Sequence, residues 1–538
     1  MPHQRLRTTE PRTLRRWACA LGTALVLTAG LAGLPATAHA SDGPTAEMVN
    51  RLEQSNWLAS FQVPGVAVVQ IRDGGVTWSK GYGTTNTSNG VPVTANTIFR
   101  VGSITKSVTA WGVMRLVEQG RMDLDTPVES YLTRWHLPPS PFDPDGVTIG
   151  RLLNHTAGLN MQDYSPVTTR PLPSLEQSLS GGSGKPGDRN SDNVRITTEP
   201  GTQMEYSNGG YTMLQLAIEE VTGEAFASYM QREVLDPLGM TRSSFVERPE
   251  LAAETATGYT NGGRPVPPTL LTEQAAGGLY TSANDVARFA VAAMTGPSGE
   301  RPGRGVLTPA GVATLLSPIT VAHGMTTSFG YEVETLSDGT KAAGHGGKNT
   351  GWLSQFTTLP DRAEGLVVLT NSDNDGLIGF TTQAWADSLG VGHPRTTQRL
   401  MDELSFQYTL MLSIGAVLGT VALGGGFFLI RGQRSGHRTW AWRGVNRLQP
   451  LRASVRIVAP LAVFVGAAAW WLYPVRITLA SISPVRTSLA TAALLTLCLT
   501  AAAAALTRTR RVPAAAPAEQ VHALAPPGTE SHRLRLKV

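Results

Sequence analysis

One S-x-x-K segment places the hydroxyl of Ser103 three residues before the amine of Lys106. A serine hydroxyl is a weak nucleophile until a neighbouring base takes its proton. If Ser103 opens a helix, Lys106 shares its face, and a buried lysine beside another cation can lose its proton near neutral pH. The alternative is a serine that only caps the helix and a lysine that faces solvent. Because the chain has six lysines, a chance match is uncommon, but the motif alone leaves both interpretations open.

A Y-x-N segment with Tyr206 and Asn208 is the second candidate. A tyrosinate beside a lysine can act as a general base, and an asparagine amide can hold a substrate carbonyl. The motif is weak, since Tyr259 and Asn261 also match it. The first match lies in a turn between a Pro-Gly and a Gly-Gly pair, ahead of an apolar helix, which suits the presentation of side chains. Tyr259 is typical of the end of a hairpin strand. We therefore favour Tyr206, for which a buried structural tyrosine is the alternative.

The third candidate is a glycine-rich segment on or beside a predicted strand, Gly344-His345-Gly346-Gly347-Lys348. Glycines within a strand allow another backbone or a ligand to come close. The histidine could therefore contact a ligand, or it could face solvent at a tight bend.

In this order, the three segments resemble the S-x-x-K, Y-x-N and K-T-G or H-x-G boxes of class C β-lactamase-related serine hydrolases and penicillin-recognising enzymes. The resemblance covers about residues 45–390. Further segments are similar to this family: Phe99-Arg100-Val101-Gly102, Leu152-Leu153-Asn154-His155-Thr156-Ala157-Gly158-Leu159, Pro237-Leu238-Gly239-Met240-Thr241 and Ala276-Gly277-Gly278-Leu279-Tyr280.

The resemblance implies catalytic roles for three side chains. Ser103 would be the nucleophile of an acyl-enzyme, and Lys106 and Tyr206 would transfer the proton. The backbone N–H groups of Ser103 and Lys348 would form the oxyanion hole, where one donor contributes about 2.7–4 kcal/mol in other hydrolases. Water would deacylate the enzyme. Neither a metal nor a cofactor is implied.

The resemblance also implies a substrate-binding group made of Asn208, His345, Gly346, Gly347 and Lys348. Members that use penicillin well have a threonine hydroxyl where Gly346 stands, and His345 is mostly neutral at pH 7. This difference favours an ester or a D-amino-acid amide over a β-lactam or a D-Ala-D-Ala end, although Lys348 could supply charge. β-Lactamase or D-alanyl-D-alanine carboxypeptidase activity is the alternative, with a small-molecule or cell-wall-derived peptide substrate in either case.

Motifs of other enzyme classes are missing from the sequence, including G-x-S-x-G, the P-loop and H-E-x-x-H. His136 and His155 are isolated, and we interpret both as structural. A non-catalytic, cell-wall-binding sensor is a different class of hypothesis. The serine, lysine and tyrosine argue against it, because a binding-only relative usually loses one of them.

Periodicity predicts an α+β fold for the domain, a mostly antiparallel sheet beside a helical subdomain, because strands at both ends enclose helices. The resemblance implies that this sheet and subdomain are arranged as in serine β-lactamases and transpeptidases. The expected helices are 45–58, capped by Thr45, then 104–119, 210–222, 225–235, 282–294 and 376–389. The expected strands are 65–71, 76–81, 329–335, 341–345, 352–359 and 366–371.

The N-terminus is typical of a secretory signal peptide over residues 1–40. Five arginines precede an apolar stretch from Trp17 to Leu34, and Ala38-His39-Ala40 is a cleavage site. An uncleaved anchor helix is the alternative. The hydrolase domain would then occupy residues 41–395, outside the cytoplasm.

Three apolar runs in the C-terminal part are long enough for transmembrane helices, since about 20 helical residues cross a bilayer. They are residues 406–430, 457–475 and 487–506. The loop 431–456 has seven arginines and no acidic residue, and arginines also follow the third run. The positive-inside rule places that loop and the tail 507–538 in the cytoplasm. The last two runs could instead form a re-entrant hairpin.

The charge is divided between the domain and its flanks. Residues 41–405 have 25 basic and 37 acidic groups, whereas the other residues have 20 and 3. The basic sequence pI of about 9.3 therefore arises from segments beside apolar runs and does not indicate a nucleic-acid partner. We expect a plasma-membrane protein that contacts lipid through three helices.

Overall fold

The computed structural model describes residues 44–54, 57–161, 171–181, 193–267, 269–320 and 326–394, with Arg431, 438–440 and 507–509. Residues up to Ser55 form one unit, whose helix is α2 (Pro44–Gln54), and the rest of the chain forms a second. Within the expected helix over 45–58, the structure describes α2 to Gln54 and α3 (Trp57–Phe61), and residues 55 and 56 lie outside the described residues. Thr45 lies inside α2 and does not cap it.

Among the described residues, none of the helices is both long and apolar enough to cross a membrane. The expected signal peptide and the three expected spans fall outside the described residues. The described parts of the expected cytoplasmic segments are Arg431 and two short strands, β11 (Arg438–Trp440) and β12 (Thr507–Thr509), which pair antiparallel.

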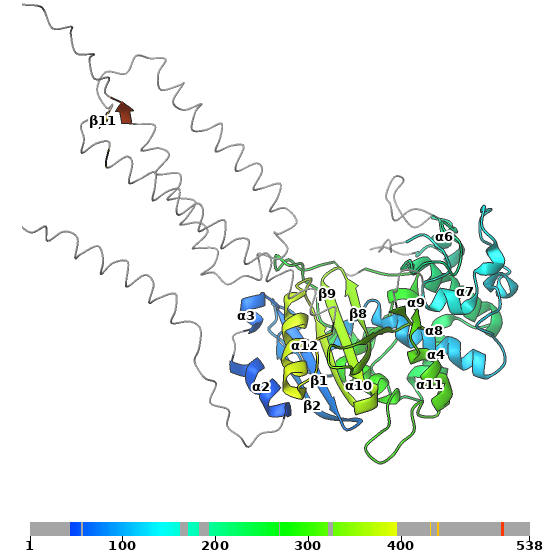
Figure 1. The fold of residues 1–538 in the computed structure, drawn as a ribbon, viewed down its shortest axis with the longest axis horizontal. Helices are drawn as coiled ribbons and strands as arrows, with labels where there is room; N and C mark the ends of the chain where they lie inside the picture. The colour runs from blue at the N-terminus through cyan, green and yellow to red at the C-terminus, as the bar shows by residue number, and fades with distance from the viewer. Residues whose placement is uncertain are drawn as a thin grey trace, which may run out of the picture. The chain divides into compact units, whose positions relative to one another are not determined.

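A six-stranded antiparallel sheet forms the first layer of the domain (Figure 1). Its spatial order is β2 (Gly75–Gly83), β1 (Gly65–Arg72), β10 (Glu364–Thr370), β9 (Trp352–Leu359), β8 (Lys341–Asn349) and β7 (Glu332–Thr335). Asp73 and Gly74 join β1 to β2 with positive φ angles of 50° and 72°. Two such residues give a turn whose twist matches a hairpin, as the Asp-Gly signal predicts. The antiparallel sheet of the α+β prediction is thus confirmed.

Both faces of the central strands are covered by helices, because successive side chains along a strand point to opposite faces and those of β1 are buried on both. Val69 of β1 and Leu369 of β10 belong to a large core with α10 (Ala283–Ala292). On the other face lies α12 (Gly376–Leu389), whose Phe380 packs on Phe61 of α3 at 5.9 Å between ring centroids (Figure 1). Because β1 is buried over nearly its whole length, its sequence is an almost continuous apolar run.

Helices and short turns form a second part of the domain beside β8. Its helices are α4 (Ile104–Glu118), α5 (Ile149–Leu153), α6 (Leu175–Leu179), α7 (Asn208–Thr222), α8 (Phe226–Met230), α9 (Gln274–Gly277) and α11 (Pro309–Leu316). A π-turn, η4 (Gln231–Leu235), continues α8, so the expected helix over 225–235 is present but not uniform. Expected strand 329–335 begins three residues later, and expected strand 341–345 extends to Asn349.

Helix α4 lies between the two parts, and twelve of its fifteen residues are buried. Its polar side chains bind neighbouring backbone. Thr105 accepts from the N–H of Leu279, Thr109 donates to the carbonyl of Ala275, and Ser107 donates to that of Gly330. A buried hydroxyl without a partner is costly, so these bonds fix the position of α4. The bonds of Thr105 and Thr109 hold α4 against the segment before β4 (Tyr280–Ser282), and the bond of Ser107 holds it against Gly330, ahead of β7.

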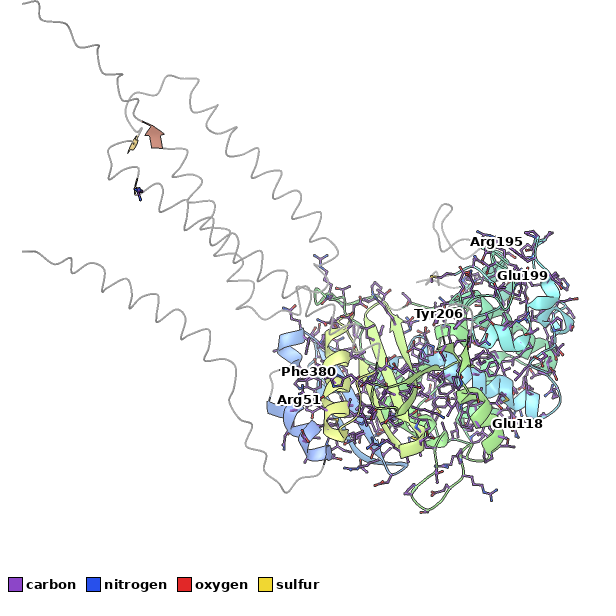
Figure 2. The ribbon with its side chains drawn as sticks, in the orientation of Figure 1. Arg51, Glu118, Arg195, Glu199, Tyr206 and Phe380 are labelled. Atoms are coloured by element: carbon purple, nitrogen blue, oxygen red, sulfur yellow. The ribbon has the colours of Figure 1, made fainter. Side chains whose placement is uncertain are left out.

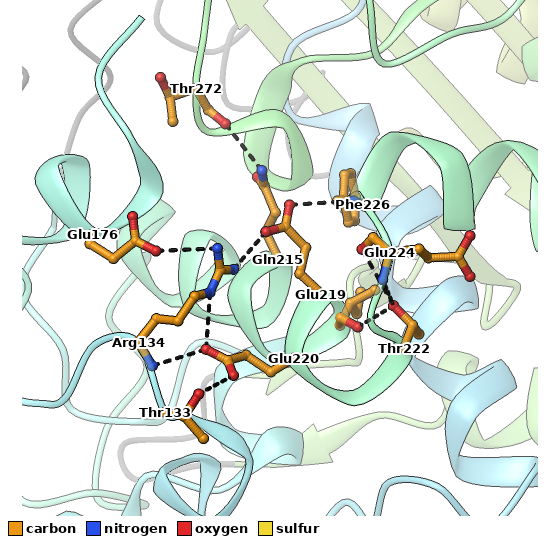
Figure 3. Close-up of polar contacts among 11 residues, drawn as sticks. Thr133, Arg134, Glu176, Gln215, Glu219, Glu220, Thr222, Glu224, Phe226 and Thr272 are labelled. Carbon is orange, nitrogen blue, oxygen red and sulfur yellow. Dashed lines mark hydrogen bonds and ion pairs between the residues drawn. The ribbon is translucent and has the colours of Figure 1, made fainter.

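Arg134 connects the C-terminal end of α7 with α6 through ion pairs (Figure 3). Its guanidinium contacts Glu219 at 2.7 Å, Glu220 at 3.1 Å and Glu176 of α6 at 3.2 Å. Further along α7, the amide of Gln215 donates to the carbonyl of Thr272 and accepts from the N–H of Ala275. These bonds connect α7, which begins at Asn208, with α9.

Candidate active site

Ser103 is the residue from which α4 starts, but its hydroxyl does not cap the helix. Its backbone is helical (φ −69°, ψ −8°) and its side chain makes no capping hydrogen bond. Lys106, one turn later, is fully buried. The interpretation of a capping serine with a solvent-facing lysine is therefore wrong. The hydroxyl is directed toward the lysine, whose Nζ lies 3.2 Å from Ser103 Oγ.

The ammonium group of Lys106 sits among polar acceptors and aromatic rings. Besides Ser103, it donates to Asn208 Oδ1 at 2.8 Å and to the carbonyl of Ala276 at 2.7 Å. It lies 4.9 Å from the ring centre of Tyr206. Cations near an aromatic face are attracted by its quadrupole. These contacts hold the amine beside the nucleophile and at the start of α7.

Tyr206 completes the group, with its Oη 2.8 Å from Ser103 Oγ. Figure 2 shows Tyr206 where the sheet meets the helical part. The other Y-x-N match lies elsewhere, because Tyr259 is buried with its hydroxyl bound to the N–H and hydroxyl of Thr87. Ser207, between Tyr206 and Asn208, caps α7 by accepting from the N–H of Gly210. The cap fixes the turn that presents both flanking side chains.

Two glycines bring the backbone of Ser103 next to that of Lys348. Gly102 has a positive φ of 51°, and a Cβ there would lie 2.6 Å from the nitrogen of Lys348. A Cβ on Gly347 would lie 1.9 Å from the carbonyl oxygen of Val101. Neither position has room for a side chain. Ser354 adds a hydrogen bond to the carbonyl of Val101 at 2.8 Å. An oxyanion hole formed by the N–H groups of Ser103 and Lys348 would need such a close approach of the two segments.

His345 and Lys348 have different surroundings, although both lie on β8. His345 is 4% exposed, and its Nδ1 lies 2.5 Å from the carbonyl oxygen of Gly346. Burial, together with the charge of Lys106, lowers the pKa of His345 although Glu332 opposes the shift. Lys348 is exposed, and Gly346 beside it is partly exposed. Any positive charge for a substrate carboxylate on this strand would therefore come from Lys348.

His155 is the residue that the sequence interpretation undervalued. Its ring stacks on that of Tyr206, with centroids 4.3 Å apart, and its Nδ1 accepts from the N–H of Ser207 at 3.2 Å. It also has a positive φ of 63°, which is uncommon for a non-glycine residue. Burial and the nearby Lys106 hold the pKa of His155 well below its usual value. A neutral imidazole therefore supports Tyr206. The sequence did hold one sign of this role, because His155 lies in the segment Leu152–Leu159, which is similar to the family.

The two buried histidines give a prediction about pH. Below pH ~6.5, histidines of the unfolded chain take up protons, whereas His155 and His345 in the fold do so only at lower pH. The unfolded state then binds more protons, so the free energy of unfolding decreases as pH falls below ~6.5. We expect the midpoint temperature of thermal unfolding to be lower at pH 5 than at pH 7.5, and this difference to be smaller in His155→Asn. Asparagine is chosen because it tolerates the positive φ of this position. Equal shifts would contradict this assignment.

Among the described residues, no group of three His, Cys, Asp or Glu side chains could hold a metal ion. The hydroxyl of Ser103 lies within hydrogen-bond distance of two side chains that can transfer protons in other hydrolases, Lys106 and Tyr206.

Comparisons with known proteins agree with this arrangement. The family model described as Beta-lactamase matches residues 46–385. PbpX of Bacillus subtilis (strain 168) is 29% identical over 250 residues, which are 45% of this chain and 58% of PbpX. This chain therefore spans less than two thirds of that relative's length.

Two solved structures share the fold. The octameric penicillin-binding protein homologue from Pyrococcus abyssi is 27% identical with a TM-score of 0.54, and the match covers 64% of this chain and 77% of that one. The crystal structure of SurE with D-Leu is 25% identical with a TM-score of 0.52, covering 65% and 78%. Because the family model covers most of the chain, this protein belongs to the beta-lactamase family of serine hydrolases and penicillin-binding-like proteins.

Proposed function

We propose that the protein is a membrane-anchored, extracytoplasmic serine hydrolase that acts through an acyl-enzyme on an ester or a D-amino-acid amide. The observation that supports this most directly is the position of Ser103 Oγ, 3.2 Å from Lys106 Nζ and 2.8 Å from Tyr206 Oη. A hydroxyl within hydrogen-bond reach of two proton-transfer groups is the arrangement that nucleophilic catalysis requires.

The proposed reaction has two halves. Ser103 Oγ attacks the substrate carbonyl carbon, and its proton passes to the unprotonated member of the pair formed by Lys106 and Tyr206, either a neutral lysine amine or a tyrosinate. The N–H groups of Ser103 and Lys348 stabilise the oxyanion, and the pair then gives the proton to the leaving alcohol or amine. In the second half, water gives a proton to the same pair and attacks the acyl carbon. The ester bond to Oγ breaks, Ser103 regains its proton and the acid leaves.

The substrate class is inferred from the third box. Gly346 offers no hydroxyl and His345 is held neutral by burial, so a substrate carboxylate would find little positive charge except at Lys348. This favours an ester or a D-amino-acid amide derived from, or similar to, a cell-wall peptide. The likeness to SurE, solved with D-Leu, supports a D-configured residue. A β-lactamase or D-alanyl-D-alanine carboxypeptidase is the alternative, and a non-catalytic cell-wall sensor is the second.

Covalent labelling of the full-length chain tests the function. The membrane-embedded protein would be treated with a fluorescent penicillin and, separately, with a fluorophosphonate, and Ser103→Ala would be the control. We expect fluorophosphonate labelling of the wild type only, with weak penicillin labelling. Strong and lasting penicilloyl labelling of Ser103 would favour the carboxypeptidase alternative. Rapid hydrolysis of the penicilloyl adduct would favour the β-lactamase alternative. A folded wild type that takes up neither label would contradict catalysis and favour the sensor.

The proposed anchor consists of residues 406–430, 457–475 and 487–506, with a cleaved signal at 1–40 and the domain at 41–395. It is supported by the length of the three apolar runs and by the arginines at 431–456. Alkaline phosphatase fused after residue 405 should be active, and a fluorescent protein fused after Val538 should fold in the cytoplasm. An inactive phosphatase fused after residue 405 would contradict the proposed position of the domain outside the cytoplasm.

Tyr206→Phe removes one of the two proton-transfer groups while it keeps the ring against His155. We expect fluorophosphonate labelling to slow by about a hundredfold or more, the usual range for a general base or acid. Tyr259→Phe is the matched control, because it also removes a buried hydroxyl from a Y-x-N segment. Its labelling rate should stay close to wild type. Equal rates in both variants would remove Tyr206 from the mechanism.

A further inference from the structure

A cavity of about 730 Å³ lies apart from Ser103, Lys106 and Tyr206, none of which lines it. It is bounded by β3 (Ile98–Arg100), by Tyr280 of β4 and by residues from the segments 244–258 and 265–267, which include part of the 3-10 helix η5 (Pro249–Glu254). Cavities of roughly 300–1,000 Å³ hold small ligands. The space is therefore sufficient for a small organic molecule.

The walls of this cavity are apolar, but three arginines and one acidic residue also line it. The apolar side chains include Ile98, Val246, Leu251, Ala256, Val266 and Trp352. Two of the arginines have carboxylate partners, because Arg242 pairs with Glu254 and Arg248 with Glu250. The third, Arg100, is different.

Arg100 is only 8% exposed, and within the part of the chain that the structure describes it makes no ion pair. Its guanidinium donates one hydrogen bond, to the hydroxyl of Thr269, and lies 5.6 Å from the ring centre of Tyr280. Burial lowers the pKa of Arg100, although the charges of Tyr280 and of Glu247, another lining residue, oppose the shift. Burying a cation without an anion is costly, and a guanidinium has five N–H donors to satisfy.

We propose that this cavity binds a small amphipathic carboxylate, whose carboxylate pairs with Arg100 and whose aromatic or aliphatic body packs against Trp352 and Leu251. A bound carboxylate would give Arg100 a direct ion pair in addition to the more distant charge of Glu247, and bidentate pairing suits a guanidinium. The apolar walls would cover the rest of the molecule. The ligand is separate from the acylated substrate, since the cavity does not include the nucleophile.

The cavity nevertheless shares a strand with the candidate active site. Arg100 pairs with Tyr280 in the β3–β4 register, and the N–H of Val101 donates to the carbonyl of Leu279. Gly102 and Ser103 follow directly. A ligand on Arg100 therefore binds the chain three residues before the nucleophile, but from outside the catalytic group.

The probe is 4-(4-fluorophenyl)butyrate, whose fluorine NMR signal would be titrated with the full-length protein in nanodiscs. Empty nanodiscs account for partition into lipid, and the uncharged 4-(4-fluorophenyl)butyramide tests the role of charge. We expect saturable binding of the acid, and binding of the amide at least about tenfold weaker, as for loss of a charge-assisted hydrogen bond. Equal affinity for acid and amide, or no saturable binding, would overturn the proposal.

Three variants locate the binding. Arg100→Met should weaken acid binding by about tenfold or more. Ala252→Trp fills the cavity from η5 and should abolish binding, and it stays informative if Arg100→Met does not fold. Ala253→Trp is the matched control, because Ala253 is exposed, as Ala252 is, but does not line the cavity. Unchanged binding in Ala252→Trp, or equal loss in Ala253→Trp, would contradict this location.

Discussion

Lys106→Met is expected to slow acylation of Ser103 by about a thousandfold, within the range for loss of a general base. Methionine has a similar length and can occupy the buried volume, but it cannot accept or donate a proton. The ammonium contacts to Ser103 and Asn208 would both be lost. The measurement is the second-order rate constant for labelling by the fluorophosphonate.

Lys341→Met is the control for this change, because Lys341 is exposed at the start of β8. Its labelling rate should equal that of the wild type. Thermal unfolding of Lys106→Met checks that the fold is retained, since the variant also removes a charge from a fully buried position. A folded Lys106→Met that is labelled at the wild-type rate would show that Tyr206 alone activates the serine.

Gly102→Ala should reduce acylation by about a hundredfold or more, comparable to the loss of one oxyanion-hole donor. The new Cβ would lie 2.6 Å from the nitrogen and 2.7 Å from the oxygen of Lys348. Backbone atoms cannot give way as a flexible side chain can, so β8 or the first turn of α4 must move. Either movement separates the N–H groups of Ser103 and Lys348, and the labelling rate measures the result.

Gly120→Ala is the matched control for Gly102→Ala. Gly120 follows α4, has a positive φ of 68°, and has nothing within 4 Å of the position of a Cβ. Both substitutions introduce left-handed backbone strain of about 1–2 kcal/mol, but only Gly102→Ala adds the clash. If the two variants lose the same stability and label at the same rate, the close approach of β8 has no part in acylation.

Local sequence patterns predicted that Ser103 and Lys106 share one face of a helix, but left open whether the lysine faces the serine or solvent. Both lie in the first turn of one helix, and the three-residue spacing decides their common face. The Asp73-Gly74 turn was predictable for the same reason, because turn chemistry depends on neighbouring residues. The helix periodicity of α7, α10 and α12 likewise required no knowledge of the fold.

Features that depend on distant segments were not predictable in this way. The stacking of His155 on Tyr206 joins two loops, and an isolated histidine has no local signal for its partner. Arg100 lies in the segment Phe99–Gly102, which is similar to the family, but its burial results from packing against the distant residues Thr269 and Tyr280. The π-helical turn η4 also lies where helical periodicity continues, so pattern alone could not locate it.

The strand order of the main sheet has a consequence for synthesis of the chain. β1 lies between β2 and β10, and Val66 pairs with Thr370. The emerging polypeptide can form the β1–β2 hairpin early, but the other edge of β1 stays open until almost the whole domain has been made. Such high contact order slows folding and leaves an apolar edge exposed to aggregation. Folding of this sheet is therefore completed only after nearly all of the domain has left the ribosome, and a nascent chain that stops before Glu364 retains that open edge.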